Sequence, residues 1–341
     1  MLGSNGLARL AWALLGTVAC GLAAPASAAD QPKLGYSAGF LTDPFQAVLV
    51  QETLKEAAAQ GMTALPATNA NGDAAKQISD IHNLIATGAQ VLVLNPTDSQ
   101  AIVPALAFAE QKKVPAVSID IAPAGGAYYI AVRADNTRMG EDACKAVGEG
   151  LKGKGTVLSL MGDQATTNGR DRTIGFDNCM RASYPGIKII AQPTNWKADR
   201  ATSIAQTIVT STPDLSAIYM QSDSVMLAGV LNVLKSAGKL KKVGEPGHIF
   251  AVSIDGTAVA LDRLREGMID TVISQPLNLY VKFAVGYAKA ALDGKTVTAG
   301  PTDHNSSIVP VGKSFQDLLS ATVVTKSNAD DATLWGNKAK S

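Results

Sequence analysis

The sequence has almost no excess charge of either sign, because 30 lysines and arginines stand against 29 aspartates and glutamates, giving a formal net charge of +1. It also lacks a basic run and a basic stripe with interleaved aromatic side chains. A nucleic-acid-binding surface needs such a concentration of positive charge to neutralise backbone phosphates. We therefore expect no nucleic-acid partner.

Long apolar runs are equally scarce, and the one long run, Leu10–Ala24, lies near the N-terminus. It follows Arg9 and precedes the small residues 26–28, which is the layout of a secretory signal cleaved after Ala28. It is shorter than the roughly 20 apolar residues that span a bilayer. A lipoprotein signal through Cys20 is the alternative, although Thr17 stands where an aliphatic residue is usual. The sequence predicts an exported protein.

Cysteine is rare as well, with three in the whole chain. Removal of residues 1–28 would leave only Cys144 and Cys179. In an oxidising compartment outside the cytoplasm two such thiols tend to form a disulfide. Two buried free thiols are the alternative.

Catalytic motifs are missing too. The sequence has no nucleophile elbow, no phosphate-binding P-loop, no glycine-rich dinucleotide fingerprint and no zinc-protease motif. Its three histidines, His82, His248 and His304, are too scattered to indicate a metal site or a triad. We expect no enzyme, no cofactor and no metal. A carbohydrate-active enzyme that uses paired carboxylates is the catalytic alternative.

What the sequence does contain is a regular alternation of short β-type runs and amphipathic helical stretches, which predicts βαβ units and parallel sheets. One helix should begin at Pro44, with a core face at Ala47, Val50, Leu54, Ala57 and Ala58. A second series of units follows Asn136, and about 310 mature residues exceed what one core usually serves. The sequence therefore predicts two α/β halves. Their expected strands are 33–38, 91–94, 116–119, 156–160, 187–191, 217–220 and 250–254.

Polar residues gather directly after these strands. Parallel sheets bind ligands beyond the carboxyl ends of their strands. Asp98, Asp163 and Asp223 are also good helix caps, whereas Arg172, Trp196 and Gln275 are poor ones. We therefore expect a binding site rather than a set of caps. The residues concerned are Asp43, Asn95 and Asp120 in the first half and Arg172, Trp196, Asp255 and Gln275 in the second.

These residue types suit a polyhydroxylated ligand. Each buried hydroxyl left without a partner costs about 1–3 kcal/mol. Carboxylates accept hydrogen bonds, a guanidinium donates in a fork, and amides do both. Phe45 and Trp196 offer aromatic surfaces for the apolar faces of a sugar ring. A core position is the alternative for Phe45.

At this point the sequence resembles a known family, the type I periplasmic sugar-binding proteins of the ribose- and galactose-binding group, which serve ABC transporters. The resemblance runs from about Lys33 to Pro310. It rests on the order and spacing of six short motifs, each of which is weak alone. They are Asp43-Pro44-Phe45, Leu94-Asn95-Pro96-Thr97-Asp98, Ala134-Asp135-Asn136, Gly169–Arg172 with Gly175-Phe176, Gln221-Ser222-Asp223 and Ile254-Asp255-Gly256.

The resemblance implies an α/β fold of two doubly wound parallel-sheet lobes joined by three hinge crossovers, near Ala134–Asn136, Gln275 and His304–Ser306. After a signal peptide at 1–28, the N-terminal lobe would comprise 29–134 plus 276–304. The C-terminal lobe would comprise 135–275 plus 305–341. The family's strand order 2-1-3-4-5 would place the helices of Cys144 and Cys179 side by side, which makes a disulfide between them geometrically reasonable.

The resemblance also implies a set of ligand contacts, with departures from the ribose-binding members. Ile121 replaces an arginine, Gln46 and Ile254 replace aromatic residues, and Ser222 replaces an asparagine. These changes argue against ribose and leave another sugar or a linear polyol. The expected ligand-binding residues are Asp43, Phe45, Gln46, Asn95, Asp120, Asn136, Arg172, Trp196, Ser222, Asp255 and Gln275.

The function implied is that of a monomeric periplasmic protein that captures a sugar or polyol by hinge closure and delivers it to an ABC transporter permease in the inner membrane. A chemoreceptor is a further partner that the family allows. One alternative is a binding protein for another small polar metabolite, such as a signalling furanone. A sugar-responsive transcription regulator with the same two-lobed core is another, but such proteins begin with a helix-turn-helix rather than an export signal.

Overall fold

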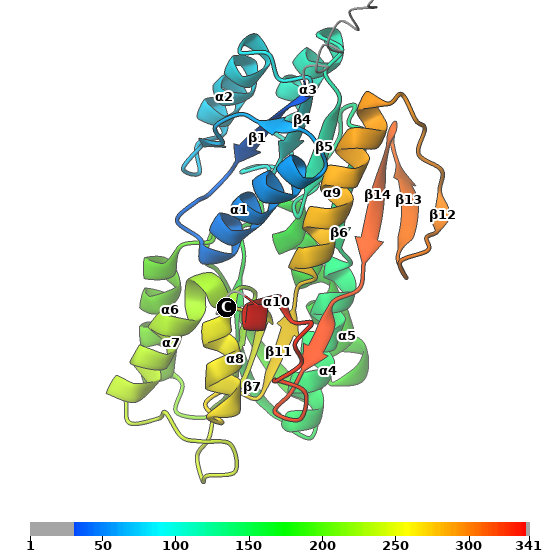
Figure 1. The fold of residues 1–341 in the computed structure, drawn as a ribbon. Coiled ribbons are helices and arrows are strands. Elements are labelled where there is room, and N and C mark those ends of the chain that lie inside the picture. Colours follow the sequence, from blue (N-terminus) through cyan, green and yellow to red (C-terminus); the bar gives the residue numbers. More distant parts are fainter. Residues whose placement is uncertain (1–30, 339–341) are drawn as a thin grey trace, which may run out of the picture. The chain divides into compact units, whose positions relative to one another are not determined.

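The computed structural model describes residues 31–338, so the predicted signal peptide and Cys20 lie outside the described residues. Two β-sheets organise this part of the chain (Figure 1). The central strands of the first sheet are parallel and run in the order β2-β1-β4-β5-β6, and β3 also pairs with β1. This is the expected order 2-1-3-4-5, in which β2 and β3 together form strand 2. They are β1 (Lys33–Ala38), β2 (Thr63–Ala64), β3 (Thr68–Asn69), β4 (Val91–Leu94), β5 (Ala116–Ile119) and β6 (Ile130–Ala134).

Helices cover both faces of the first sheet, and we call this assembly the first lobe. On one face lie α1 (Pro44–Ala59) and α9 (Leu277–Leu292), and on the other α2 (Ala74–Ala86) and α3 (Val103–Gln111). Side chains of β4 alternate between the two cores: Val91 and Val93 join the α1 and α9 side, and Leu92 and Leu94 the other. The charge-free sequence of this strand follows from its burial on both faces.

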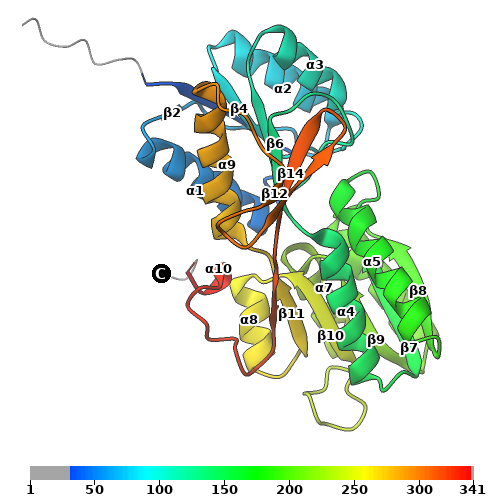
Figure 2. The ribbon, with the colours of Figure 1, turned by 90° about the vertical axis from the view of Figure 1, so that its right-hand side faces the viewer.

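The second lobe repeats this plan with the strand order β8-β7-β9-β10-β11, which confirms the expected 2-1-3-4-5 order. Helices α4 and α5 cover one face, and α6, α7 and α8 cover the other (Figure 2). Its strands are β7 (Gly155–Met161), β8 (Ile187–Pro193), β9 (Leu215–Met220), β10 (Phe250–Asp255) and β11 (Thr271–Ser274). Its helices are α4 (Asn136–Gly150), α5 (Thr167–Ser183), α6 (Ala198–Ser211), α7 (Asp223–Ser236) and α8 (Ala258–Arg265).

The predicted start of α1 at Pro44 is confirmed, but its core face differs from the expected one. Leu49 and Thr53 are fully buried, whereas Ala47 and Ala58 are exposed. The helix begins where Asp43 accepts a hydrogen bond from the amide of Phe45, and proline at the first position needs no such bond. The small side chain of alanine at both exposed positions misled the periodicity argument.

The chain passes between the lobes three times. The first passage follows β6 at Ala134–Asn136, and the second lies between β11 and α9 at Gln275, as expected. The third differs from the prediction near His304–Ser306. Beyond α9 the chain stays in the first lobe through β12 (Gly300–Pro301), β13 (Ser307–Val311) and β14 (Ser314–Leu319).

The third passage therefore follows Leu319. Strand β14 pairs in parallel with β6, and β15 (Thr322–Val324) then pairs antiparallel with β11 in the second sheet. Assigning all of residues 305–341 to the C-terminal lobe was wrong for 305–319, since their ladder bonds belong to the first sheet. That the lobes move as separate bodies stays a prediction.

Cys144 and Cys179 lie on the adjacent helices α4 and α5. Their sulfur atoms are 2.04 Å apart, joined as a disulfide, with a Cα–Cα distance of 6.1 Å. None of the helices within residues 31–338 combines the length and the apolar character that crossing a bilayer requires.

Candidate functional site

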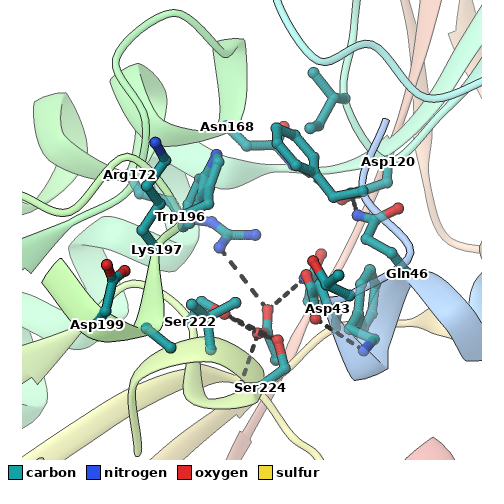
Figure 3. Close-up of a pocket in the computed structure, with 18 residues that line it drawn as sticks. Asp43, Gln46, Asp120, Asn168, Arg172, Trp196, Lys197, Asp199, Ser222 and Ser224 are labelled. Atoms are coloured by element: carbon teal, nitrogen blue, oxygen red, sulfur yellow. Dashed lines mark hydrogen bonds and ion pairs between the residues drawn. The ribbon is translucent and has the colours of Figure 1, made fainter. Parts of the chain in front are cut away.

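A cavity of about 330 Å³ lies between the two lobes, and side chains from both lobes point into it (Figure 3). This volume is within the range of sites for small molecules. Nine of the eleven predicted residues line it, although they come from segments far apart in the sequence. They are Asp43, Phe45, Gln46, Asp120, Arg172, Trp196, Ser222, Asp255 and Gln275.

The first lobe contributes a carboxylate and amide group whose geometry is fixed by mutual hydrogen bonds. Gln46, in the first turn of α1, donates from Nε2 to Oδ2 of Asp120 over 2.9 Å. Asp120 directly follows β5 and has a backbone φ of 65°. Asp43 uses Oδ1 to accept from the amide of Phe45 over 2.9 Å, and the residue lines the cavity. Acceptors therefore dominate this wall.

Arg172 projects from α5 of the second lobe and is held on several sides. Its Nε donates to Oδ1 of Asn136 over 2.8 Å, and Nη1 donates to the carbonyl of Gln221. Nη1 also lies 3.9 Å from the carboxylate of Asp255. The guanidinium lies 5.7 Å from the ring centre of Trp196, within the range of a cation–π contact. Arg172 is thus a preorganised donor.

Asp255, at the end of β10, is the most heavily bonded carboxylate of the site. Its Oδ2 accepts from Ser222 over 2.6 Å and from the hydroxyl of Ser224 over 2.9 Å. Its Oδ1 accepts from Nε2 of Gln275 over 2.7 Å. These donors keep the carboxylate aimed at Arg172 and the cavity.

Two predicted residues, Asn95 and Asn136, do not line the cavity but lie behind it. Asn95 donates from Nδ2 to Oε1 of Gln46 and to Asp120, the latter over 3.3 Å. Asn136 accepts from Arg172. Both therefore orient residues of the wall. Asn95 was expected from its place after a strand and Asn136 from the family resemblance, but neither signal distinguishes a wall residue from its support.

Sequence reasoning missed several wall residues, of which Asn168 is the best connected. Its Nδ2 donates to Oδ1 of Asp120 over 2.9 Å, and its Oδ1 accepts from Arg133 over 3.0 Å. Asn168 lies four residues before Arg172 on α5, and this helical spacing was a usable signal. The other missed wall residues are Phe40, Thr42, Lys197, Ala198, Asp199, Ser224 and Val225. Ile121, which the resemblance put where ribose-binding members have an arginine, also lines the cavity.

Asp98, Asp163 and Asp223 were also considered as helix caps, and they do not all have the same role. Asp98 and Asp163 accept from backbone amides two residues ahead, at Gln100 and Ala165, as local turn residues do. Asp223 instead reaches another segment, accepting from the amides of Gly256 and Thr257 and from the hydroxyl of Thr257. It fixes the loop that follows Asp255.

The cavity is acidic. Four aspartates line it, Asp43, Asp120, Asp199 and Asp255, against two cationic side chains, Arg172 and Lys197. Burial, and then the neighbouring Asp255 carboxylate, raise the pKa of Asp43 to about 7. Burial also raises the pKa of Asp120, although the charge of Arg172 opposes it. A wall rich in acceptors suits a ligand that donates hydrogen bonds and disfavours an anion.

Phe45 combines both of the roles considered for it. Phe45 lines the cavity, yet only 2% of the residue is exposed. It also meets Tyr280 and Trp335 edge to face, at centroid distances of 6.5 and 5.5 Å. The opposite aromatic residue, Trp196, comes from the second lobe.

Direct hydrogen bonds join the lobes beside the cavity. The amide of Thr167 donates to Oγ of Ser99 over 2.9 Å, and its hydroxyl donates to the carbonyl of Ala122 over 3.1 Å. Arg133 of β6 forms an ion pair of 2.7 Å with Asp171 of α5. The N-terminal part of α5 is therefore docked on the first lobe.

The sequence and the structure both match known proteins. A family profile described as "Periplasmic binding protein domain" matches residues 34–296. The chain is 28% identical to the ribose import binding protein of Haemophilus influenzae, over 84% of this chain and 94% of that protein. It is 30% identical to the ribose import binding protein of Bacillus subtilis, over 77% and 83% of the two chains.

Among solved structures, an ABC transporter solute binding protein from Mycobacterium smegmatis with bound glycerol superposes with a TM-score of 0.77. The superposition covers 89% of this chain and 99% of that one, at 26% sequence identity.

Proposed function

Because the chain belongs to the periplasmic binding protein domain family, we propose that it is the solute-binding component of an ABC transporter and that its ligand is a neutral sugar or polyol. The family is one of binding proteins, so the chain binds its solute and does not transform it.

One observation carries the proposal: acceptors and donors from both lobes converge on one small cavity. Asp43 and Asp120 of the first lobe face Arg172, Trp196 and Asp255 of the second. A ligand with several hydroxyls can use both walls at once, whereas either wall alone would leave part of it unpaired. Ligand contacts on both sides would favour a closed form over an open one.

The relatives support this class of ligand. Two are named for ribose import, and another is the xylitol-binding protein of Mycolicibacterium smegmatis, 26% identical over 84% of this chain. The solved structure described above holds glycerol. For this chain we propose a ligand other than ribose, because Gln46 and Ile121 line the cavity where ribose-binding members have an aromatic residue and an arginine.

The proposal includes a site of action. After cleavage of residues 1–28 the protein would work in the periplasm as a monomer, and its closed form would dock on the permease of the inner membrane. A chemoreceptor could recognise the same closed form.

A thermal-shift screen tests the proposed ligand class. The panel comprises D-ribose, D-allose, D-galactose, xylitol, myo-inositol and glycerol, with D-galacturonate and xylonate as charged counterparts. A ligand at 100 times its dissociation constant stabilises by about 2.7 kcal/mol. We expect at least one neutral compound to raise Tm. The acids should bind on the order of 100-fold more weakly, because like charges placed together cost several kcal/mol.

Arg172→Gln and Arg170→Gln form the matched pair of variants for this screen. Both residues lie on α5, but only Arg172 lines the cavity. Arg172→Gln should abolish the ligand-dependent shift, while Arg170→Gln should retain it. A panel without any neutral binder, or equal shifts for both variants, would contradict the proposal.

A further inference from the structure

The chain continues past the last strand into a C-terminal segment, residues 325–338, that lies beyond the part matched by the family profile. It contains the short helix α10 (Trp335–Lys338), which lies beside α8 (Figure 2). Arg265, at the end of α8, fastens the segment by donating to the carbonyl of Ala329 over 2.7 Å and to Oδ1 of Asn337 over 2.6 Å. Ala329 and Leu334 are buried in the core of the second lobe.

Trp335 of this segment contacts two residues of the cavity wall from behind. Its Nε1 donates to the backbone carbonyl of Asp255 over 2.7 Å. Its ring meets Phe45 of the first lobe, with centroids 5.5 Å apart and planes at 77°. Only 5% of Trp335 is exposed, and it is not among the residues that line the cavity. It therefore touches the wall on both lobes without reaching the space for a ligand.

The contact with Asp255 falls on a strained piece of backbone. Asp255 has φ of 118°, a value that glycine tolerates and other residues rarely adopt. Such a conformation persists only where its surroundings hold it. Two donors satisfy the Asp255 carbonyl, the amide of Gln275 over 2.9 Å and the indole of Trp335. The indole thus helps to maintain the turn that aims the Asp255 carboxylate at Arg172.

The segment also lies so close to this turn that only glycine fits at position 336, directly after Trp335. A Cβ placed on Gly336 would lie 2.3 Å from the carbonyl oxygen of Gly256. The glycine therefore lets the segment pack directly on the residues that follow Asp255. The close approach and the indole hydrogen bond are two independent observations that place the segment against the binding turn.

We propose that Trp335 of the C-terminal segment is a positioning residue, which holds the Asp255 turn and the Phe45 ring in place from behind the cavity. This inference rests on the proposed function for its effect on affinity. It predicts that losing the indole weakens binding by more than the loss of folding stability accounts for.

The test compares three variants of the full mature chain. Trp335→Phe keeps an aromatic ring beside Phe45 and removes the donor to Asp255. Trp335→Ala removes both contacts. Leu334→Ala is the matched control, because Leu334 is the adjacent residue, is 4% exposed and packs in the second-lobe core rather than against Asp255 or Phe45.

Calorimetric titration with xylitol, D-allose and myo-inositol gives the first readout. We expect the dissociation constant to rise about tenfold for Trp335→Phe, the equivalent of one hydrogen bond, and further for Trp335→Ala. Leu334→Ala should lower Tm yet leave the dissociation constant within about threefold of the wild type, as expected for a site it does not touch. Equal affinities in wild type and both Trp335 variants would overturn the inference.

Hydrogen exchange of the ligand-free proteins gives the second readout and does not depend on the ligand. In both Trp335 variants, peptides covering residues 253–257 should exchange faster than in the wild type and in Leu334→Ala. If the wild type binds none of the three compounds, that result counts against the proposed ligand class, and the exchange data alone decide the role of Trp335. Unchanged exchange at 253–257 would overturn that role.

Discussion

Asp43 shows how one residue serves both the fold and the site. As the N-cap of α1 it accepts from the amide of Phe45, and its side chain also lines the cavity. Burial and the negative charge of Asp255 raise its pKa to about 7. An aspartate in an unfolded chain titrates near pH 4. Between these values the folded protein holds a proton that the unfolded chain has already released.

This shift gives a pH dependence of stability with a defined sign. As pH rises from about 4 to 7 the free energy of unfolding decreases, because the folded state keeps a proton that the unfolded state has released. Asparagine at this position remains a good N-cap but cannot ionise. The Tm of Asp43→Asn minus that of wild type should therefore increase by about 2 °C or more between pH 5 and pH 8.

Differential scanning calorimetry at pH 5, 6, 7 and 8 without ligand measures this difference. Asp98→Asn is a suitable control, because Asp98 has a comparable local role and lies outside the cavity wall. Parallel Tm profiles for wild type and Asp43→Asn would contradict the account of Asp43.

Among the elements, α5 has the most roles. Its N-terminal residue Thr167 binds the first lobe, Asn168 and Arg172 face the cavity, and Cys179 joins it to α4. Three glycines allow α5 to pack closely against its neighbours. At two of them, Gly140 on α4 and Gly175 on α5, a Cβ would come within 2.2 Å of the neighbouring helix backbone. At Gly169 of α5 a Cβ would come equally close to the carbonyl oxygen of Asp163.

The disulfide should stabilise this pair of helices. It closes a loop with a sequence separation of 35, for which chain entropy predicts about 3–4 kcal/mol. Dithiothreitol should therefore lower the Tm of the wild type by roughly 6 °C. The double variant Cys144→Ala/Cys179→Ala should show a low Tm that reductant does not change. A wild-type Tm that is insensitive to the reductant would show that the disulfide does not stabilise the fold.

The sequence predicted seven strands, and all seven are present, because apolar runs such as Val91–Leu94 allow few other conformations. It missed two buried strands, β6 and β11. It also missed β12 to β14, which have no such apolar run. Buried and exposed residues do not alternate along β13, and this strand contains Pro310 near the sheet edge. Strand β14 includes the buried polar residues Gln316 and Asp317. The position of the third passage depended on these strands.

For the molecule as a whole, the site could be located from the sequence but not resolved in detail. Strand ends indicated Asp120, Arg172 and Asp255 because parallel strands bring their carboxyl ends to one edge. Supports such as Asn136 and Trp335 depend on packing between distant segments. Trp335 follows no strand end and resembles no motif, so only the fold reveals its contact with Asp255.

The whole-molecule account requires that the two lobes share one ligand. Ser99, Ala122 and Asp120 of the first lobe already bind α5 of the second, so a closed arrangement is supported by protein contacts as well. A ligand adds to these contacts only if it spans both walls. Its position is therefore the feature on which the account depends.

A crystal structure of the mature protein, grown with the neutral sugar or polyol that gives the largest thermal shift, tests this directly. The account predicts one ligand in the cavity, with hydroxyls within hydrogen-bonding distance of Asp43 or Asp120 and of Arg172 or Asp255. A ligand bound to one lobe alone, or bound outside this cavity, would contradict it.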